Sequence, residues 1–151
     1  MNKLVLCITL FCVAGCTLLE PPPPPPQKEI VISPDAPKAI GPYSQAVKFG
    51  NTVYCSGQLG IDPATGDLVL GDIQAETRQV LKNLGAVLKA TDMSYENVIK
   101  ATVFLDDINN YKLVNEVYAE FFTSSAPARE AVQVAKLPLN GRVEISCIAA
   151  K

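Results

Sequence analysis

The chain has 151 residues, a one-domain length, and 48% of them are hydrophobic, which is ample for a packed core. It contains no histidine. This excludes Ser-His-Asp and Cys-His catalysis, histidine ligation of a metal and a histidine pH switch. The five cysteines show no C-x-x-C spacing, so no cysteine metal site is expected, and the formal charge of −2 offers no electrostatic surface for nucleic acid.

The first 15 residues are predicted to form a secretory signal. Lys3 is followed by an apolar run over 4–14, which is too short for a good transmembrane helix. Val13-Ala14-Gly15-Cys16 then resembles a bacterial lipobox, in which the signal is cleaved before Cys16 and its thiol carries the lipid. A simple signal peptide, cleaved nearby without lipidation, is the alternative. Because Thr17 stands where an Asp would favour the inner membrane, we expect an outer-membrane anchor facing the periplasm.

The segment 16–35 is predicted to be a lipid-anchored, proline-rich linker. The prolines at 21–26 fix φ and lack an amide donor, so they should form a polyproline II rod of roughly 20 Å. Binding of this run to an SH3-like groove is the alternative. Within the linker, Ile30-Val31-Ile32 is compatible with a short strand.

Two cysteines remain as candidate thiols once the signal is removed and Cys16 is lipidated. Cys55 and Cys147 both lie in predicted strands among apolar neighbours, where a free cysteine behaves as a small core residue. A disulfide between them would require facing Cβ atoms. We therefore interpret both residues as structural.

Residues 36–151 alternate in periodicity as one α+β domain. Strands are predicted at 46–49 and 52–55 around the turn Gly50-Asn51, and a further turn is expected at 62–67. A helix with Asp72 as N-cap and Glu76 in its first turn should run through 73–88, followed by a strand at 98–105 and a helix over 114–121. Strands at 132–135 and 143–150 end the chain. This order predicts a single mixed β-sheet with both helices packed on one face.

Two charged residues accompany the last two strands. Arg129 precedes the strand at 132–135, and Glu144 lies inside the strand at 143–150. A guanidinium can grip a carboxylate with two parallel hydrogen bonds, and a glutamate can orient or deprotonate a water. The pair indicates hydrolysis of a small anionic substrate, and a solvated surface pair of little energy is the alternative.

Several segments match the motifs of one protein family in the same order. They are Ala39-Ile40-Gly41-Pro42-Tyr43-Ser44-Gln45-Ala46, Cys55-Ser56-Gly57-Gln58-Leu59-Gly60, Thr102-Val103-Phe104-Leu105, Tyr118-Ala119-Glu120-Phe121-Phe122, Pro127-Ala128-Arg129 and Val143-Glu144-Ile145. Together they cover residues 36–151 without a large gap, and this domain resembles the RidA/YjgF family.

The resemblance implies a chorismate-mutase-like domain that forms a homotrimer, with active sites in the clefts between subunits. It also implies hydrolysis of reactive 2-imino and enamine acids, such as 2-aminoacrylate, to 2-keto acids and ammonia. No cofactor or metal, no nucleic-acid partner and a small imino or keto acid ligand are expected. A membrane would be contacted through the lipid anchor.

The resemblance also assigns roles to individual residues. Arg129 would hold the substrate carboxylate together with the backbone N–H of Ala131, while Glu144 would position water and shuttle a proton. Tyr43 would wall the pocket, unless it is an ordinary core aromatic. Three further residues are expected to shape the cleft or the subunit contact: Asn115, Ser56 and Gly57. For Asn115 the alternative is an ordinary amide on a helix surface.

Two departures from the family pattern bear on specificity. Ala131 stands where many members carry a cysteine, although a role played by a backbone N–H survives that change. The loop over 123–126 is short compared with some members, so the cleft mouth can differ from theirs.

A non-catalytic module that binds small carboxylates is the main alternative function, because an exported protein would seldom meet imines made in the cytoplasm. A ribonuclease or translation inhibitor is the third.

Overall fold

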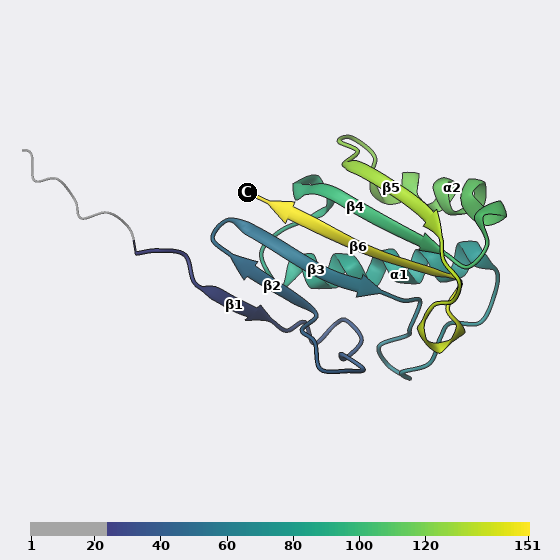
Figure 1. Ribbon diagram of the computed structural model, residues 1–151, viewed down its shortest axis with the longest axis horizontal. Coiled ribbons are helices and arrows are strands. Elements are labelled where there is room, and N and C mark those ends of the chain that lie inside the picture. The colour runs from purple at the N-terminus through teal and green to yellow at the C-terminus, as the bar shows by residue number, and fades with distance from the viewer. Residues whose placement is uncertain (1–23) are drawn as a thin grey trace, which may run out of the picture.

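A single six-stranded sheet with two helices forms the computed structural model, which describes residues 24–151 (Figure 1). The predicted signal, Cys16 and the first prolines lie outside the described residues. The strand order is β1-β2-β3-β6-β4-β5, and only the pair of β4 and β5 is parallel. The strands are β1 (Lys28–Val31), β2 (Ala46–Phe49), β3 (Thr52–Gln58), β4 (Val98–Leu105), β5 (Ala128–Gln133) and β6 (Val143–Ala150). The helices are α1 (Ile73–Lys89) and α2 (Tyr111–Phe121).

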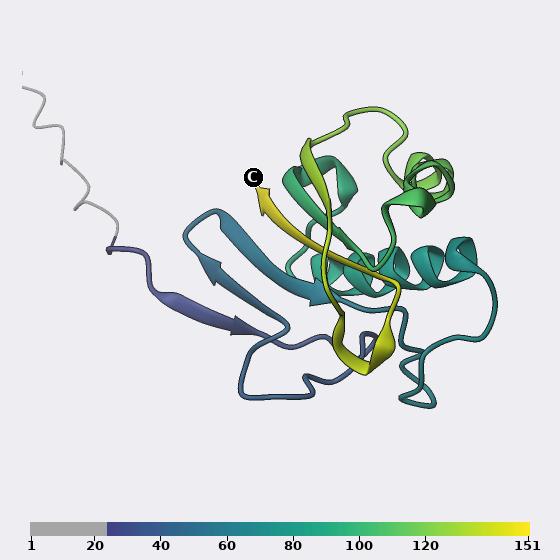
Figure 2. The ribbon, with the colours of Figure 1, turned by 45° about the vertical axis from the view of Figure 1, so that its right-hand side comes forward.

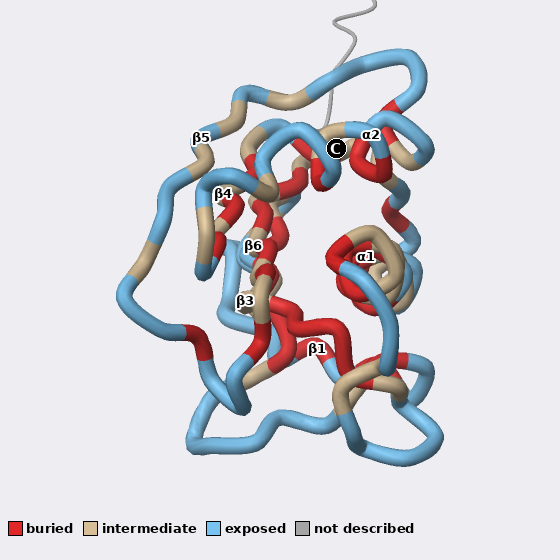
Figure 3. Tube along the Cα trace, turned by 90° about the vertical axis from the view of Figure 1, so that its right-hand side faces the viewer, coloured by how far each residue is buried: buried red, intermediate tan, exposed pale blue. Residues whose placement is uncertain are grey.

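Both helices cover the same face of the sheet, as the sequence predicts (Figure 3). Apolar side chains on the inner face of α1 meet alternate residues of the central strands, because the helical and strand periods present one apolar side each. Fully buried members of this core include Leu81 and Leu84 of α1, Val103 of β4 and Ile145 of β6. The opposite face of the sheet carries no α-helix among the described residues.

Strand β1 joins the sheet at the edge opposite β5 (Figures 1 and 2). It pairs antiparallel with β2, and the Gln45 side chain then accepts a hydrogen bond from the N–H of Ser33 at 2.7 Å. The last part of the segment expected to be a linker is thus docked on the domain.

Among the described residues, no helix combines the length and apolar character needed to cross a membrane.

The predicted helix starts and strand bounds agree with the structure in most places. Asp72 caps α1 by accepting a hydrogen bond from the N–H of Ala75 at 2.8 Å. The turn at 62–67 closes through the N–H of Gly66 and the carbonyl of Asp62. Helix α2 begins at Tyr111, three residues before the first apolar position that marked it, because the first turn of α2 is exposed and carries no apolar stripe.

The prediction for the fifth strand was wrong in its bounds. The strand runs over Ala128–Gln133 instead of 132–135, so Arg129 lies inside it. An edge strand can hold charged residues because one of its edges and one of its faces remain in solvent. The exposed Glu130 carboxylate accepts a hydrogen bond from the Thr102 hydroxyl at 2.8 Å and forms an ion pair with Lys100, both on the neighbouring strand β4.

Cys55 and Cys147 are partners in register across β3 and β6. Both side chains are buried and both thiols are free, so they act as small core residues in this structure.

Candidate functional site

Arg129 and Glu144 point to opposite faces of the sheet within one chain. Arg129 lies directly opposite Ala101 of β4, and Glu144 lies directly opposite Phe104 of the same strand. Paired residues share a face and successive residues alternate, so Ala101 and Phe104, three apart, lie on different faces. Arg129 therefore faces the helices, while Glu144 faces the side without helices. The sequence-predicted residues fall into two groups.

The first group surrounds the Arg129 guanidinium. Its central carbon lies 4.5 Å from the centroid of the Tyr118 ring, and one terminal nitrogen donates a hydrogen bond to the Tyr111 hydroxyl at 3.2 Å. Asn115 and Arg129 both line a pocket of about 390 Å³ whose other walls are mainly apolar, formed by Tyr118, Ala119, Phe122, Ala126 and Pro127. Aromatic rings attract a nearby cation but do not neutralise its charge.

Arg129 differs from the other two arginines of the chain. Arg78 binds Glu120 at 2.7 Å, and Arg142 binds Glu76 at 2.6 Å. No carboxylate lies within ion-pair distance of Arg129 among the residues that the structure describes. A half-buried guanidinium without a counter-charge is suited to an incoming anion, above all a carboxylate.

The N–H of Ala131 faces the free edge of β5. Val134 donates its N–H to the carbonyl of Leu105 on β4, and residues of a parallel strand alternate between the two edges. The N–H groups of Ala131 and Arg129 therefore point away from β4. This placement leaves the Ala131 N–H open to a ligand that also contacts Arg129.

The second group surrounds the Glu144 carboxylate. Glu144 lines a pocket of about 310 Å³ together with Tyr43, Ser56 and Gly57, and the remaining walls are Ile40, Leu59 and Pro138. Burial raises the pKa of Glu144, because the carboxylate loses water and gains no cation among the described residues. A glutamate with a raised pKa is a stronger base than an exposed one and can return the proton that it accepts.

Gly57 lies directly against Glu144. A Cβ atom at position 57 would overlap the carboxylate, so only glycine fits there without moving it. The register of β3 against β6 shifts between Cys55 and Gln58, which identifies a β-bulge at Ser56 and Gly57. The Ser56 hydroxyl donates to the carbonyl of Ser44 at 2.7 Å and ties the bulge to the loop that carries Tyr43.

Tyr43 is not a core aromatic. Its side chain is 48% exposed, and its hydroxyl accepts a hydrogen bond from the N–H of Ile40 at 3.3 Å. The ring therefore stands at the mouth of the Glu144 pocket, where it can contact a ligand.

Comparison with known proteins gives the family of the chain. The family model described as endoribonuclease L-PSP matches residues 33–151. The 2-iminobutanoate/2-iminopropanoate deaminase of Bos taurus is 55% identical over 122 residues, which cover 81% of this chain and 89% of that protein. The chain belongs to the RidA/YjgF family.

Solved structures of this family have the same fold. A Rid-family protein from Yersinia pestis shares 46% identity and a TM-score of 0.80, with 83% of this chain and all of that chain covered. TdcF from E. coli, solved with bound serine, shares 40% identity and a TM-score of 0.78, with 82% and 98% covered.

Tyr111 contacts Arg129 and is not a residue that the sequence pattern singled out. Tyr111, Asn115 and Tyr118 are spaced by four and three residues, and this spacing places them on one face of α2. The family resemblance alone drew attention to Asn115. The helical spacing was the signal that could have identified both tyrosines.

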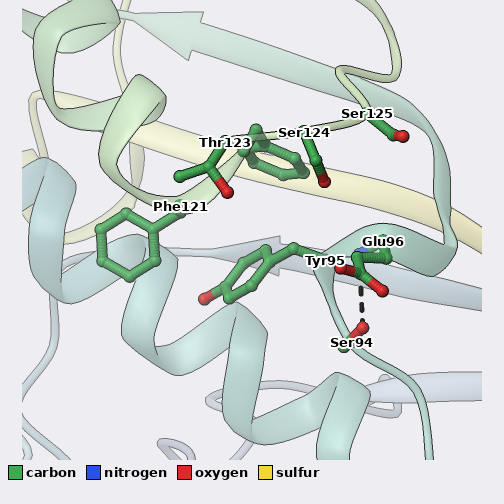
Figure 4. Close-up of a pocket in the computed structure, with 8 residues that line it drawn as sticks. Ser94, Tyr95, Glu96, Phe121, Thr123, Ser124 and Ser125 are labelled. Carbon is green, nitrogen blue, oxygen red and sulfur yellow. Dashed lines mark hydrogen bonds between the residues drawn. The ribbon is translucent and has the colours of Figure 1, made fainter.

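A third pocket, of about 220 Å³, lies where the loop after α2 faces the segment before β4 (Figure 4). Tyr95 stands in its centre, packs edge-on against Phe121 and donates its hydroxyl to the carbonyl of Leu81. Neither Arg129 nor Glu144 lines it, and its one charged side chain is Glu96. It therefore lacks the cation that a RidA-type substrate needs.

Proposed function

We propose that this protein hydrolyses reactive 2-imino acids and their enamine tautomers to 2-keto acids and ammonia. The observation that carries the proposal is the Arg129 guanidinium, which lies in an aromatic pocket without a carboxylate partner among the described residues. The deaminase from Bos taurus, at 55% identity, supports the same reaction. Arg129 binds the substrate carboxylate, with the Ala131 N–H as a second donor.

Two copies of the chain build each site. Because Arg129 and Glu144 face opposite sides of the sheet, one substrate reaches both only if a second subunit supplies one of them. The face without helices also exposes large apolar side chains, among them Tyr54 at 50% and Val132 at 44%. Such a face favours association, and a ring of three copies closes it as the family resemblance implies.

The chemistry requires one water and one proton shuttle. Water attacks the imine carbon while Glu144 takes one of its protons, and a tetrahedral amino alcohol forms. Glu144 passes that proton to the nitrogen, which completes the amino alcohol, and then moves the hydroxyl proton to the nitrogen, so that the C–N bond breaks, ammonia leaves and the carbonyl of the keto acid forms. Arg129 holds the carboxylate so that the imine carbon stays near the water, which lowers the entropic part of the barrier. The raised pKa of Glu144 suits both proton transfers.

A module that binds small carboxylates without converting them is the second candidate. TdcF from E. coli was solved with bound serine, and that relative therefore holds a small amino acid. Arg129 alone would serve binding. Glu144, held in its pocket by the close approach of Gly57, has no evident use in a module that only binds a carboxylate.

Ribonuclease activity, which the family description names, has the weakest support. Two of the three arginines are engaged by carboxylates, and the formal charge of the chain is −2. A phosphate backbone needs several unengaged cations.

Hydrolysis of freshly generated 2-iminopropanoate by the purified protein tests the proposal. We expect ammonia release well above the spontaneous rate, and near-complete loss in Glu144→Gln with binding of pyruvate retained, because the amide keeps the shape but cannot accept a proton. Pyruvate binding by a wild-type protein without any turnover would favour the binding module. Degradation of single-stranded RNA by the same preparation, abolished in Arg129→Ala, would favour a nuclease.

We also propose that the protein is lipid-anchored at the outer membrane through Cys16. The support is the sequence Val13-Ala14-Gly15-Cys16, which lies outside the described residues. A fatty-acid probe should label the wild type and leave Cys16→Ala unlabelled and released from membranes. Labelling of neither protein would contradict the anchor.

A further inference from the structure

The Tyr111 hydroxyl contacts the edge of the Arg129 guanidinium. It is the first residue of α2, its side chain is 42% exposed, and its hydroxyl oxygen lies 3.2 Å from a terminal nitrogen of Arg129. Its ring centroid is 5.7 Å from the central guanidinium carbon, so the hydroxyl, more than the ring, makes the contact.

The Tyr118 ring alone cannot fix the orientation of the guanidinium. A cation that lies over an aromatic face is attracted at nearly the same strength for any rotation in its own plane. A hydrogen bond at the edge of the guanidinium restricts that rotation, because it requires one N–H to point at one acceptor. Among the described residues, the Tyr111 hydroxyl is the group that accepts a hydrogen bond from the Arg129 side chain.

The electrostatics of Tyr111 agree with this contact. The neighbouring Asn115 amide and the Arg129 cation lower the pKa of Tyr111, since both stabilise negative charge on its oxygen. This agrees with the hydroxyl oxygen acting as the acceptor for the Arg129 N–H.

We propose that Tyr111 is a positioning residue of the carboxylate site. Its hydroxyl holds one terminal N–H of Arg129, and the remaining N–H groups face the substrate carboxylate in the orientation that a two-point grip needs. This inference rests on the proposed role of Arg129 as the carboxylate-binding residue. It adds Tyr111 to Asn115 and Tyr118, the residues of α2 that already lie at the Arg129 pocket.

Tyr111→Phe removes the hydroxyl and keeps the ring. We expect the KM for 2-iminopropanoate and the dissociation constant of pyruvate to rise about five- to tenfold, less than for a lost charged hydrogen bond to the ligand itself, because the hydroxyl acts on the carboxylate through Arg129. The value of kcat should stay within about twofold, because Tyr111 does not act on the imine carbon. Thr65→Val, which removes an exposed hydroxyl from the turn at 62–67 outside both pockets, is the control and should change neither constant.

A double-mutant cycle separates positioning from a general structural effect. In the Arg129→Lys background, Tyr111→Phe should change pyruvate affinity by less than about twofold, because the partner of the hydroxyl is gone. Unchanged KM and pyruvate affinity in Tyr111→Phe, or equal losses in both backgrounds, would overturn the inference. Weaker pyruvate binding in Tyr111→Phe beside an inactive wild type would refute the deaminase and leave the role of Tyr111 intact.

Discussion

Arg129 and Glu144 lie on the two strands that flank β4, and they face opposite sides of the sheet. A half-buried cation without a carboxylate partner faces the helices, and a half-buried carboxylate faces the uncovered side. Neither group alone explains hydrolysis of an anionic imine. Two chains that bring these faces together would supply both groups to one substrate.

Arg129→Lys should bind the substrate carboxylate poorly although it keeps the positive charge. A lysine ammonium is a point charge and cannot reproduce the planar fork. We expect the dissociation constant of pyruvate to rise about 10- to 100-fold, the loss of a two-point charged hydrogen bond. Isothermal titration calorimetry measures this change. Affinity equal to the wild type would show that Arg129 acts only through its charge.

Gly57→Ala should remove activity without unfolding the domain. The new Cβ would occupy the space of the Glu144 carboxylate and displace it from its pocket. A displacement of this kind costs about a hundredfold in kcat, because the water is no longer aligned with the imine carbon. The far-UV circular dichroism spectrum should match that of the wild type. Full activity in Gly57→Ala would mean that Glu144 can act from another position.

The rate should fall on the acid side at a higher pH than an exposed glutamate would cause. Glu144 acts as a base only when deprotonated, and burial raises its pKa, so protonation begins closer to neutral pH. A profile of kcat/KM against pH measures this limb. The residual rate of Glu144→Gln should lack the limb, since the amide does not titrate. A limb that persists in the variant would assign it to another group.

Arg142→Ala should destabilise the domain far more than Arg78→Ala. Arg142 and its own backbone N–H bond the Glu76 carboxylate, whose side chain is only 3% exposed, whereas the Arg78 pair with Glu120 lies on the surface. Loss of the Arg142 side chain leaves the buried carboxylate with the backbone N–H but without a counter-charge, and about 3 kcal/mol of unfolding free energy should be lost. Urea denaturation measures both variants. Equal losses would contradict the importance of burial.

The sequence predicted most elements because their apolar patterns are strong. The alternation in 98–105 and 143–150 gave the bounds of β4 and β6 as the structure has them. The strand with Arg129 was misplaced, because Arg129 and Glu130 interrupt the apolar pattern and are tolerated only at an edge. A local sequence pattern does not encode which strands pair, and therefore it does not show which strand lies beside β5.

The candidate site was predictable in its residues but not in its geometry. Family resemblance identified Arg129, Glu144, Tyr43 and Gly57. The face that each side chain takes depends on strand register, since a shift by one residue moves every side chain to the other face. The separation of Arg129 from Glu144 therefore emerged only with the structure. Tyr111 was not singled out because its contact joins α2 to β5, 18 residues apart in the chain.

Complementation between two inactive variants tests the shared site most directly. Arg129→Ala and Glu144→Gln proteins are mixed in equal amounts under conditions that exchange subunits, and hydrolysis of 2-iminopropanoate is measured. If each site takes Arg129 from one subunit and Glu144 from the next, about a quarter of the sites in randomly mixed trimers carry neither substitution. Recovery of about a quarter of wild-type activity is therefore expected. Activity no higher than the average of the two separate variants, with exchange verified by mass spectrometry of differently tagged subunits, would contradict it.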